Sequence, residues 1–115
     1  MKSLTIGVVG PCAAGKSTLI QRLRALGYQA KHIAQEHSYV PRMWQRLSKP
    51  DILVYLDVSY PLTIQRKNLD WTVNEYLEEI HRLRHAREHA HLYINTDALS
   101  PEDVLERVLL FLKEN

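Results

Sequence analysis

The stretch Gly10-Pro11-Cys12-Ala13-Ala14-Gly15-Lys16-Ser17 decides the fold of this 115-residue chain. It places a glycine, four free positions, a second glycine, a lysine and a serine in the order of a phosphate-binding loop, the Walker A motif. A short apolar run at residues 4–9 precedes it and predicts a buried strand. After it, apolar residues recur at helical spacing up to Leu26, and Gly27 then supplies a helix stop. Strand, loop and helix therefore all agree with the motif.

Each part of this loop has a role in holding a polyphosphate. Gly10 and Gly15 let the backbone curl closely enough for its N–H groups to surround phosphate oxygens. The helix that begins near Lys16 points its positive end at the phosphates. We expect Lys16 to reach the β and γ phosphates and the Ser17 hydroxyl to ligate Mg²⁺. The predicted nucleotide-binding residues are Gly10, Pro11, Cys12, Ala13, Ala14, Gly15, Lys16, Ser17 and Thr18.

Length and composition predict a single domain over residues 1–115 and narrow the classes of partner. Hydrophobic residues make up 45% of the chain, which excludes wholesale disorder. The formal charge of +2 gives no reason to expect a nucleic-acid partner, and no apolar run is long enough to span a membrane. Cys12 is the single cysteine, which excludes an internal disulfide and favours the reducing cytoplasm.

Strands and helices alternate along the rest of the chain. Further strands are predicted over residues 28–34, 51–57 and 92–95, the first of them polar enough for a sheet edge. Helices are expected over residues 42–47, 61–69 and 72–90 and from Pro101 onward. This order predicts a three-layer α/β fold with a parallel sheet of about four strands. The loop, Glu36 and Asp57 each follow a strand end, so we expect them on one rim.

Three blocks of the chain, residues 10–28, 50–68 and 92–112, resemble P-loop kinases of the nucleoside and nucleotide kinase group. The middle block, PDILVYLDVSYPLTIQRKN, resembles the thymidylate-kinase-like pattern of Pro-Asp, an apolar strand, Leu-Asp-Val and a helix carrying arginine. The resemblance implies a P-loop NTPase fold, ATP and Mg²⁺ as cofactors, and transfer of the γ-phosphate to a small-molecule acceptor.

The interval before the Pro-Asp strand departs from this pattern. Such kinases carry a substrate-binding insertion and a further strand there, whereas here residues 35–49 alone fill it. The chain therefore resembles a minimal version without most of the substrate-binding region. Two alternatives to a phosphotransferase stay open: a nucleotide-binding module that serves a protein partner, and a slow NTP hydrolase.

Two acidic residues are candidates for the chemistry at the rim. Glu36 follows the second strand, where an acid serves such kinases as base, magnesium partner or substrate ligand; the alternative is a solvated loop carboxylate. Asp57 ends an apolar strand, as a Walker B acid does, and would hold a Mg²⁺ ligand. By resemblance, however, the aspartate of Leu-Asp-Val belongs to a neighbouring strand and has a structural role.

The helix predicted over residues 72–90 supplies two basic candidates. Its apolar stripe, which includes Ile80, defines the inward face, and Arg84 and Arg87 fall about 40° and 20° from Ile80 at 100° per residue. We therefore expect these two arginines to face the site and to stabilise the transferring phosphoryl group, whereas Arg82 points away. Snorkelling or a salt bridge is the alternative. His81, His85 and His89 share the outward face, which favours a solvated or oligomer-contact surface and leaves a homodimer open.

Overall fold

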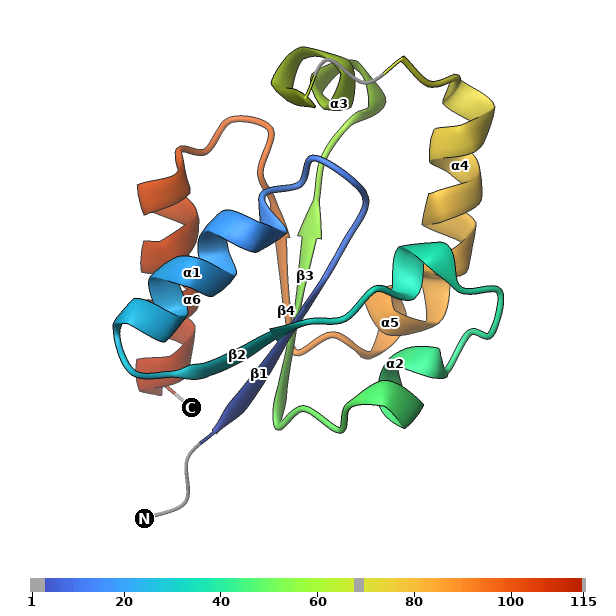
Figure 1. Cartoon of the computed structure of the whole chain (residues 1–115). Coiled ribbons are helices and arrows are strands. Elements are labelled where there is room, and N and C mark those ends of the chain that lie inside the picture. The colour runs from blue at the N-terminus through green and yellow to red at the C-terminus, as the bar shows by residue number, and fades with distance from the viewer. Residues whose placement is uncertain (1–3, 68–69, 115) are drawn as a thin grey trace.

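The computed structural model describes residues 4–67 and 70–114 as one parallel sheet with helices packed on both sides (Figure 1). In chain order the elements are β1 (Thr5–Val9), α1 (Lys16–Ala25), β2 (Gln29–His32), η1 (Gln35–His37), α2 (Met43–Leu47), β3 (Ile52–Asp57), α3 (Tyr60–Lys67), α4 (Val73–Arg82), α5 (Arg84–His89), β4 (Leu92–Asn95) and α6 (Pro101–Glu114). Among these elements, no helix is both long and apolar enough to cross a membrane. Residues 68 and 69 of the helix predicted to Leu69 lie outside the described residues.

The sheet has the strand order β2-β1-β3-β4, and all three pairings are parallel. Ile6 of β1 is aligned with Ala30 of β2 on one side and with Ile52 of β3 on the other. The two central strands are almost entirely buried, whereas β2 has only Ala30 buried, as its polar sequence predicted for an edge. The predicted α/β class and the four-stranded parallel sheet are confirmed.

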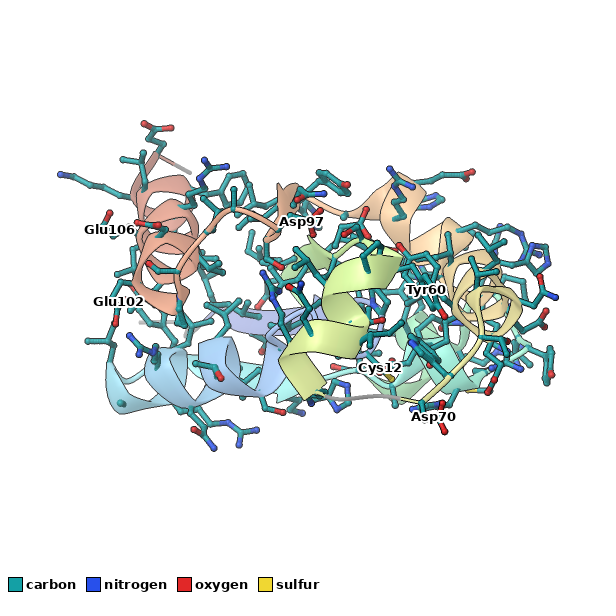
Figure 2. All side chains as sticks on the ribbon, turned by 90° about the horizontal axis from the view of Figure 1, so that it is seen from above. Cys12, Tyr60, Asp70, Asp97, Glu102 and Glu106 are labelled. Carbon is teal, nitrogen blue, oxygen red and sulfur yellow. The ribbon has the colours of Figure 1, made fainter. Side chains whose placement is uncertain are left out.

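Each face of the sheet carries its own apolar core. On one face α1 and α6 cover side chains such as Leu23, Val54 and Val108. On the other face α2 and α5 enclose a smaller core that includes Trp44, Tyr55 and Leu83. Seen from above, the pair α1 and α6 and the pair α4 and α5 lie on opposite sides of the sheet (Figure 2). The three-layer arrangement leaves the carboxyl ends of the strands uncovered by the cores, where ligands bind in such sheets.

The segment predicted as one helix over residues 72–90 is two helices. It opens as predicted, because Thr72 and Glu75 form a capping box in which each side chain bonds the other's backbone N–H. Helix α4 ends at Arg82, Leu83 has φ −90° and ψ −4°, and α5 then begins at Arg84. The angular extrapolation along one straight helix is therefore wrong beyond residue 82.

Candidate functional site

The loop between β1 and α1 adopts the conformation that its glycines allow. Gly10 lies so close to β3 that a Cβ atom would stand 2.0 Å from the carbonyl oxygen of Leu56. Gly15 has φ +98°, and Ala13 has φ +69°, a left-handed conformation that is rare for a residue with a side chain. Since this conformation costs on the order of 1 kcal/mol for alanine, the packing around the loop must hold it.

Lys16 and Glu36 form a buried ion pair beneath the loop. The Lys16 Nζ atom lies 2.6 Å from Glu36 Oε2 and also donates to the carbonyl oxygens of Gly10 and Pro11. The two residues are 8% and 2% exposed. Because β1 and β2 are neighbours and parallel, the segments that follow them meet, and the expected convergence of Glu36 with the loop is confirmed.

The second carboxylate oxygen of Glu36 is not satisfied. Oε1 is buried and has no hydrogen-bond partner among the described residues. Two imidazoles approach Oε2 instead, with His32 Nε2 at 3.5 Å and His37 Nε2 at 4.0 Å. A buried carboxylate oxygen without a partner is costly, so this atom points to a ligand that is not part of the chain.

A second carboxylate, that of Glu79 on α4, closes the loop from the other side. Its Oε1 atom accepts the backbone N–H of Cys12 at 3.0 Å, and its Oε2 atom lies 3.2 Å from the Cys12 Sγ atom. Burial, followed by the hydrogen bond from the thiol to Glu79, raises the pKa of Cys12 to about 11. The positive charge of Lys16 acts in the opposite direction, but burial and Glu79 outweigh it.

Loop, β2 and α3 together line a pocket of about 260 Å³, which we call the phosphate pocket. Its lining residues are Cys12, Ala13, Ala14, Gly15, Lys16, Ser17, Thr18, His32, Glu36, His37 and Lys67. The two remaining predicted loop residues, Gly10 and Pro11, support Lys16 through their carbonyl groups. Ser17 is exposed in the pocket wall, so its hydroxyl is accessible to a ligand.

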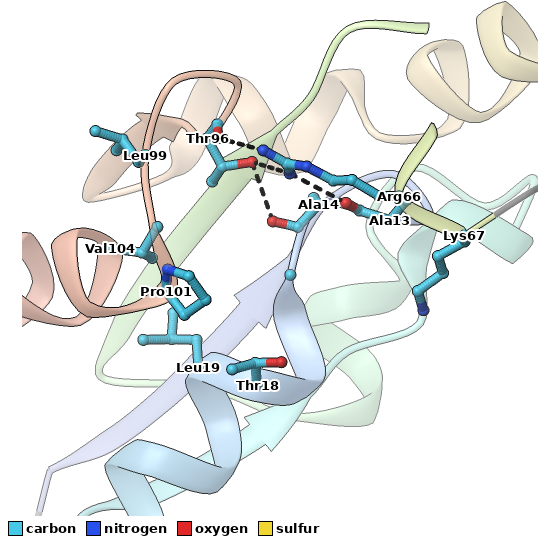
Figure 3. Close-up of a pocket in the computed structure, with 11 residues that line it drawn as sticks. Ala13, Ala14, Thr18, Leu19, Arg66, Lys67, Thr96, Leu99, Pro101 and Val104 are labelled. Carbon is cyan, nitrogen blue, oxygen red and sulfur yellow. Dashed lines mark hydrogen bonds between the residues drawn. The ribbon is translucent and has the colours of Figure 1, made fainter. Parts of the chain in front are cut away.

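A second pocket of about 230 Å³ adjoins the loop on the side of α6 (Figure 3). Arg66 of α3 crosses it and donates to the Ala13 carbonyl oxygen and to Thr96 Oγ1, at 3.3 and 2.9 Å. The rest of the wall is mostly apolar and includes Leu99, Pro101 and Val104. The two pockets share the wall formed by Ala13, Ala14, Gly15, Thr18 and Lys67.

Asp57 does not join this site. Its Oδ1 atom accepts the backbone N–H of Val58 at 2.9 Å, and its Oδ2 atom accepts the hydroxyl of Tyr93. The residue lines neither the phosphate pocket nor the pocket beside Arg66. The expectation that Asp57 shares a Mg²⁺ ion with Ser17 is therefore corrected, and the structural alternative fits, because the carboxylate ties β3 to β4.

Arg84 and Arg87 do not face the loop either. Arg84 is exposed and donates to the carbonyl oxygen of His81, while Arg87 lies over the ring of Tyr93 at 5.1 Å. The arginine that reaches the site is Arg82, which was expected to point away. It donates to the carbonyl oxygen of Glu36 at 3.3 Å and packs on the ring of Tyr39. Arg82 follows the buried Glu79 by three residues and so lies on the same side of α4, whereas Val73 and Leu77 of the predicted inward stripe are 47% and 53% exposed. The break at Leu83 redirects only Arg84 and Arg87, which come after it.

Sequence reasoning missed three residues of the site: Glu79, Lys67 and His32. Glu79 stands among outward-facing polar residues in the sequence, and only the position of α4 above the loop turns it inward. Lys67 ends α3, where a basic side chain is ordinary because it complements the helix dipole. His32 ends β2 and Glu36 lies in η1, so the turn between these two elements brings the side chains together, and the sequence carries no signal for that turn.

Comparison with known proteins bears on the fold. No protein-family model and no curated protein sequence matches this chain. Among solved structures, shikimate kinase from Acinetobacter baumannii in complex with shikimate is similar, with a TM-score of 0.66 and 18% sequence identity. The match covers 99% of this chain and 95% of that chain. The chain has the fold of a P-loop kinase. At this level of identity the likeness concerns the P-loop kinase fold alone, not a thymidylate-kinase-like subgroup or a particular substrate.

Proposed function

We propose that this chain binds the Mg²⁺ complex of a nucleoside triphosphate, ATP, and transfers its γ-phosphoryl group to a hydroxyl of a small-molecule acceptor. The observation that carries the proposal is the buried Lys16–Glu36 pair in the wall of the phosphate pocket. In this proposal Lys16 is the cation that binds the phosphates, and Glu36 beside it is the carboxylate that serves the acceptor. The P-loop kinase fold supports the same reaction class.

The two pockets divide the nucleotide between them in this proposal. Backbone N–H groups of the loop and the Lys16 ammonium would hold the β and γ phosphates. The base would lie in the pocket beside Arg66, whose apolar wall suits an aromatic ring. Arg66 would fix α3 against the loop through its bonds to Ala13 and Thr96.

The residues present fit a magnesium ion. The Ser17 hydroxyl is open to the phosphate pocket, and Glu36 Oε1 is without a partner in that pocket's wall. Ser17 would ligate Mg²⁺, and the negative charge of Glu36 in the same pocket would favour the ion. When bound, Mg²⁺ supplies a Lewis acid that neutralises charge on the phosphate oxygens.

The chain's own side chains would then serve the acceptor. Glu36 would take the proton of the attacking hydroxyl at Oε1, since Oε2 is already occupied by Lys16. Lys67 would stabilise charge on the transferring group from the shared wall of the two pockets, the role first expected of Arg84 and Arg87. His32 and His37 would contact the acceptor itself.

One observation favours a nucleotide-binding module or slow hydrolase as the second candidate. Glu79 occupies the N–H of Cys12, which is one of the donors expected to face phosphate. In such a module a nucleotide phosphate would displace the Glu79 carboxylate from the loop and so release α4, which a protein partner could then recognise without any acceptor.

Binding and turnover separate these candidates. Calorimetric titration with Mg²⁺·ATP and Mg²⁺·GTP should show binding by the wild type and at least a tenfold loss in Lys16→Ala. Lys113→Ala, the same charge change on the exposed end of α6, should bind like the wild type. Equal affinity in Lys16→Ala, or no binding by the wild type, would refute nucleotide binding at this loop.

Radiolabelled γ-phosphate should next be followed into a panel of acceptors and into free phosphate. The panel contains shikimate, a nucleoside, a nucleotide and a sugar. Transfer that falls by about tenfold to a hundredfold in Lys67→Ala, with KM for ATP little changed, supports the phosphotransferase. Release of phosphate without transfer supports the hydrolase, and binding without either supports the module.

A further inference from the structure

We propose that Cys12, Glu36 and His37 form a binding site for a divalent transition-metal ion of the zinc class, distinct from the Mg²⁺ that accompanies a nucleotide. The proposal goes beyond the proposed function and does not depend on it. One ligand atom from each of the three residues lies within 4.8 Å of the other two. Figure 2 shows Cys12 on the side of α3 that faces α4, at the edge of the phosphate pocket.

The distances require only a small closure around the ion. Zinc bonds are about 2.3 Å to sulfur and about 2.0–2.2 Å to imidazole nitrogen and carboxylate oxygen, so ligand atoms around one ion stand roughly 3.5–4 Å apart. The side chain of His37 is 64% exposed and therefore free to rotate toward the other two ligands. His32 Nε2 approaches the same carboxylate, at 3.5 Å from the oxygen that Lys16 holds, and is the nearest candidate for a fourth ligand.

The unpartnered oxygen of Glu36 points independently to a ligand here. Glu36 is 2% exposed, one of its oxygens is held by Lys16, and the other has no hydrogen-bond partner among the described residues. A metal ion would give that oxygen the bond it lacks without disturbing the pair with Lys16. The structure thus combines a cluster of three donors with a buried oxygen that is available for coordination.

Charge at the site also favours a divalent ion. Without metal, the formal charges of Glu36, Glu79 and Lys16 sum to minus one around a neutral thiol. Coordination by Cys12 requires the thiolate, and the thiol proton leaves to solvent by way of Glu79 Oε2, 3.2 Å from the sulfur. The ion and the thiolate together add one positive charge, which brings the buried group to neutrality.

The donor types select the metal. Thiolate and imidazole bind Zn²⁺ or Co²⁺ strongly and Mg²⁺ poorly. Mg²⁺ would instead find oxygen donors at Ser17 and at nucleotide phosphates. Because Glu36 and the loop take part in both sites, occupancy by zinc would compete with phosphate binding.

The test uses the full chain without nucleotide. Titration with zinc chloride should show one ion bound per chain, weakened at least tenfold in Cys12→Ser and in His37→Asn. His81→Asn, an exposed histidine on α4 outside the cluster, should bind like the wild type. Cobalt chloride should produce a near-ultraviolet thiolate charge-transfer band, absent in Cys12→Ser and abolished when zinc displaces the cobalt.

A measurement on the wild type guards against a variant that fails to fold. Cys12 is the single cysteine, so zinc should protect the chain from alkylation by iodoacetamide, with at least a tenfold slower rate. Absence of zinc binding, an unchanged affinity in a folded Cys12→Ser variant, or a cobalt spectrum without the thiolate band would each overturn the proposal. An equal loss of affinity in His81→Asn would do the same, because it would move the metal to another histidine.

Discussion

The ammonium of Lys16 and the carboxylate of Glu36 depend on each other because both are removed from water. Loss of one partner from a buried pair leaves the other charge uncompensated, which typically costs about 3–5 kcal/mol. An exposed pair behaves differently, since water screens it. The chain offers such a pair in Arg22 and Glu102, whose side chains are 38% and 68% exposed.

This contrast gives the first prediction. Glu36→Gln should lower the free energy of unfolding by about 3 kcal/mol, whereas Glu102→Gln should lower it by less than about 1 kcal/mol. The double variant Lys16→Met/Glu36→Gln should cost less than the sum of its single variants. Urea denaturation of Glu36→Gln, Glu102→Gln, Lys16→Met and the double variant measures these free energies. Equal losses for Glu36→Gln and Glu102→Gln would show that the buried pair is not formed in solution.

Cys12 carries the second prediction, which concerns pH. Its pKa is raised from 9.0 to about 11, so at pH 8 its thiolate fraction, and with it the rate of alkylation, should be roughly a hundredfold below that of a free cysteine. Glu79→Gln should lower the pKa and speed the reaction. A pH–rate profile with an apparent pKa at or below 9 would contradict the raised value.

The same shift has a defined sign for stability. The folded pKa lies above the unfolded one, so the contribution of Cys12 is fully present below about pH 9 and is lost as pH rises toward 11. Cys12→Ala should therefore flatten the decline in unfolding free energy over that window.

The sequence predicted individual site residues well where a motif defines them and poorly elsewhere. The loop residues and Glu36 meet, because strand ends in a parallel sheet share a rim. Glu79 and Lys67 could not be predicted, since both have ordinary polar surroundings in the sequence. Their placement depends on the angles at which α3 and α4 leave the sheet.

Helix α4 links the phosphate-binding loop to the end of β3 through side-chain hydrogen bonds. Its first turn is fixed by the capping box of Thr72 and Glu75, and Tyr76 donates its hydroxyl to the Val58 carbonyl oxygen. One turn later Glu79 reaches Cys12. The position of this helix therefore determines whether the loop is closed by its own chain.

Thr72→Ala gives the prediction for this element. Loss of the cap should destabilise the protein by about 1 kcal/mol, and hydrogen exchange should quicken at the first turn of α4 and at the Cys12 amide. Asn74→Ala, at an exposed position two residues later, is the matched control and should change stability by less than about 0.5 kcal/mol. If the Cys12 amide exchanges at the same rate in both variants, the position of α4 does not control the hydrogen bond between Glu79 and the loop.

The break between α4 and α5 was beyond prediction for a physical reason. Neither glycine nor proline stands near Leu83 in the sequence, so no local signal marks the break. It arises because Leu83 and Ala86 must both be buried in the core under α5. Tertiary packing determined the helix end, and the arginine assignment depended on it.

For the whole molecule, a bound nucleotide should act as a stabiliser. Binding to the folded state alone contributes about 2.7 kcal/mol when the ligand is at a hundredfold excess over its dissociation constant. For a chain of this size that corresponds to a rise in Tm on the order of 10 °C. Differential scanning fluorimetry with Mg²⁺·ATP should show this rise in the wild type and not in Lys16→Ala; the same rise in both would place the ligand elsewhere.

The architecture of the whole molecule could be predicted from the alternation of strands and helices along the chain. The four parallel strands and the edge position of β2 agree with the prediction. The residues between β2 and β3 form only η1 and α2, as the short interval indicated.

The central position of β1 has a consequence for how the protein folds. The first strand is bonded to β2 and to β3, and Ile6 is aligned with Ile52, far along the chain. Gly10 also rests against Leu56, so the loop cannot adopt its shape until the third strand has docked. Pairings of such long sequence separation form slowly, because the entropy of closing the intervening chain is lost before they stabilise anything. On the ribosome, the segment that carries the motif would be synthesised before β3 and would become competent to bind phosphate only after β3 has docked.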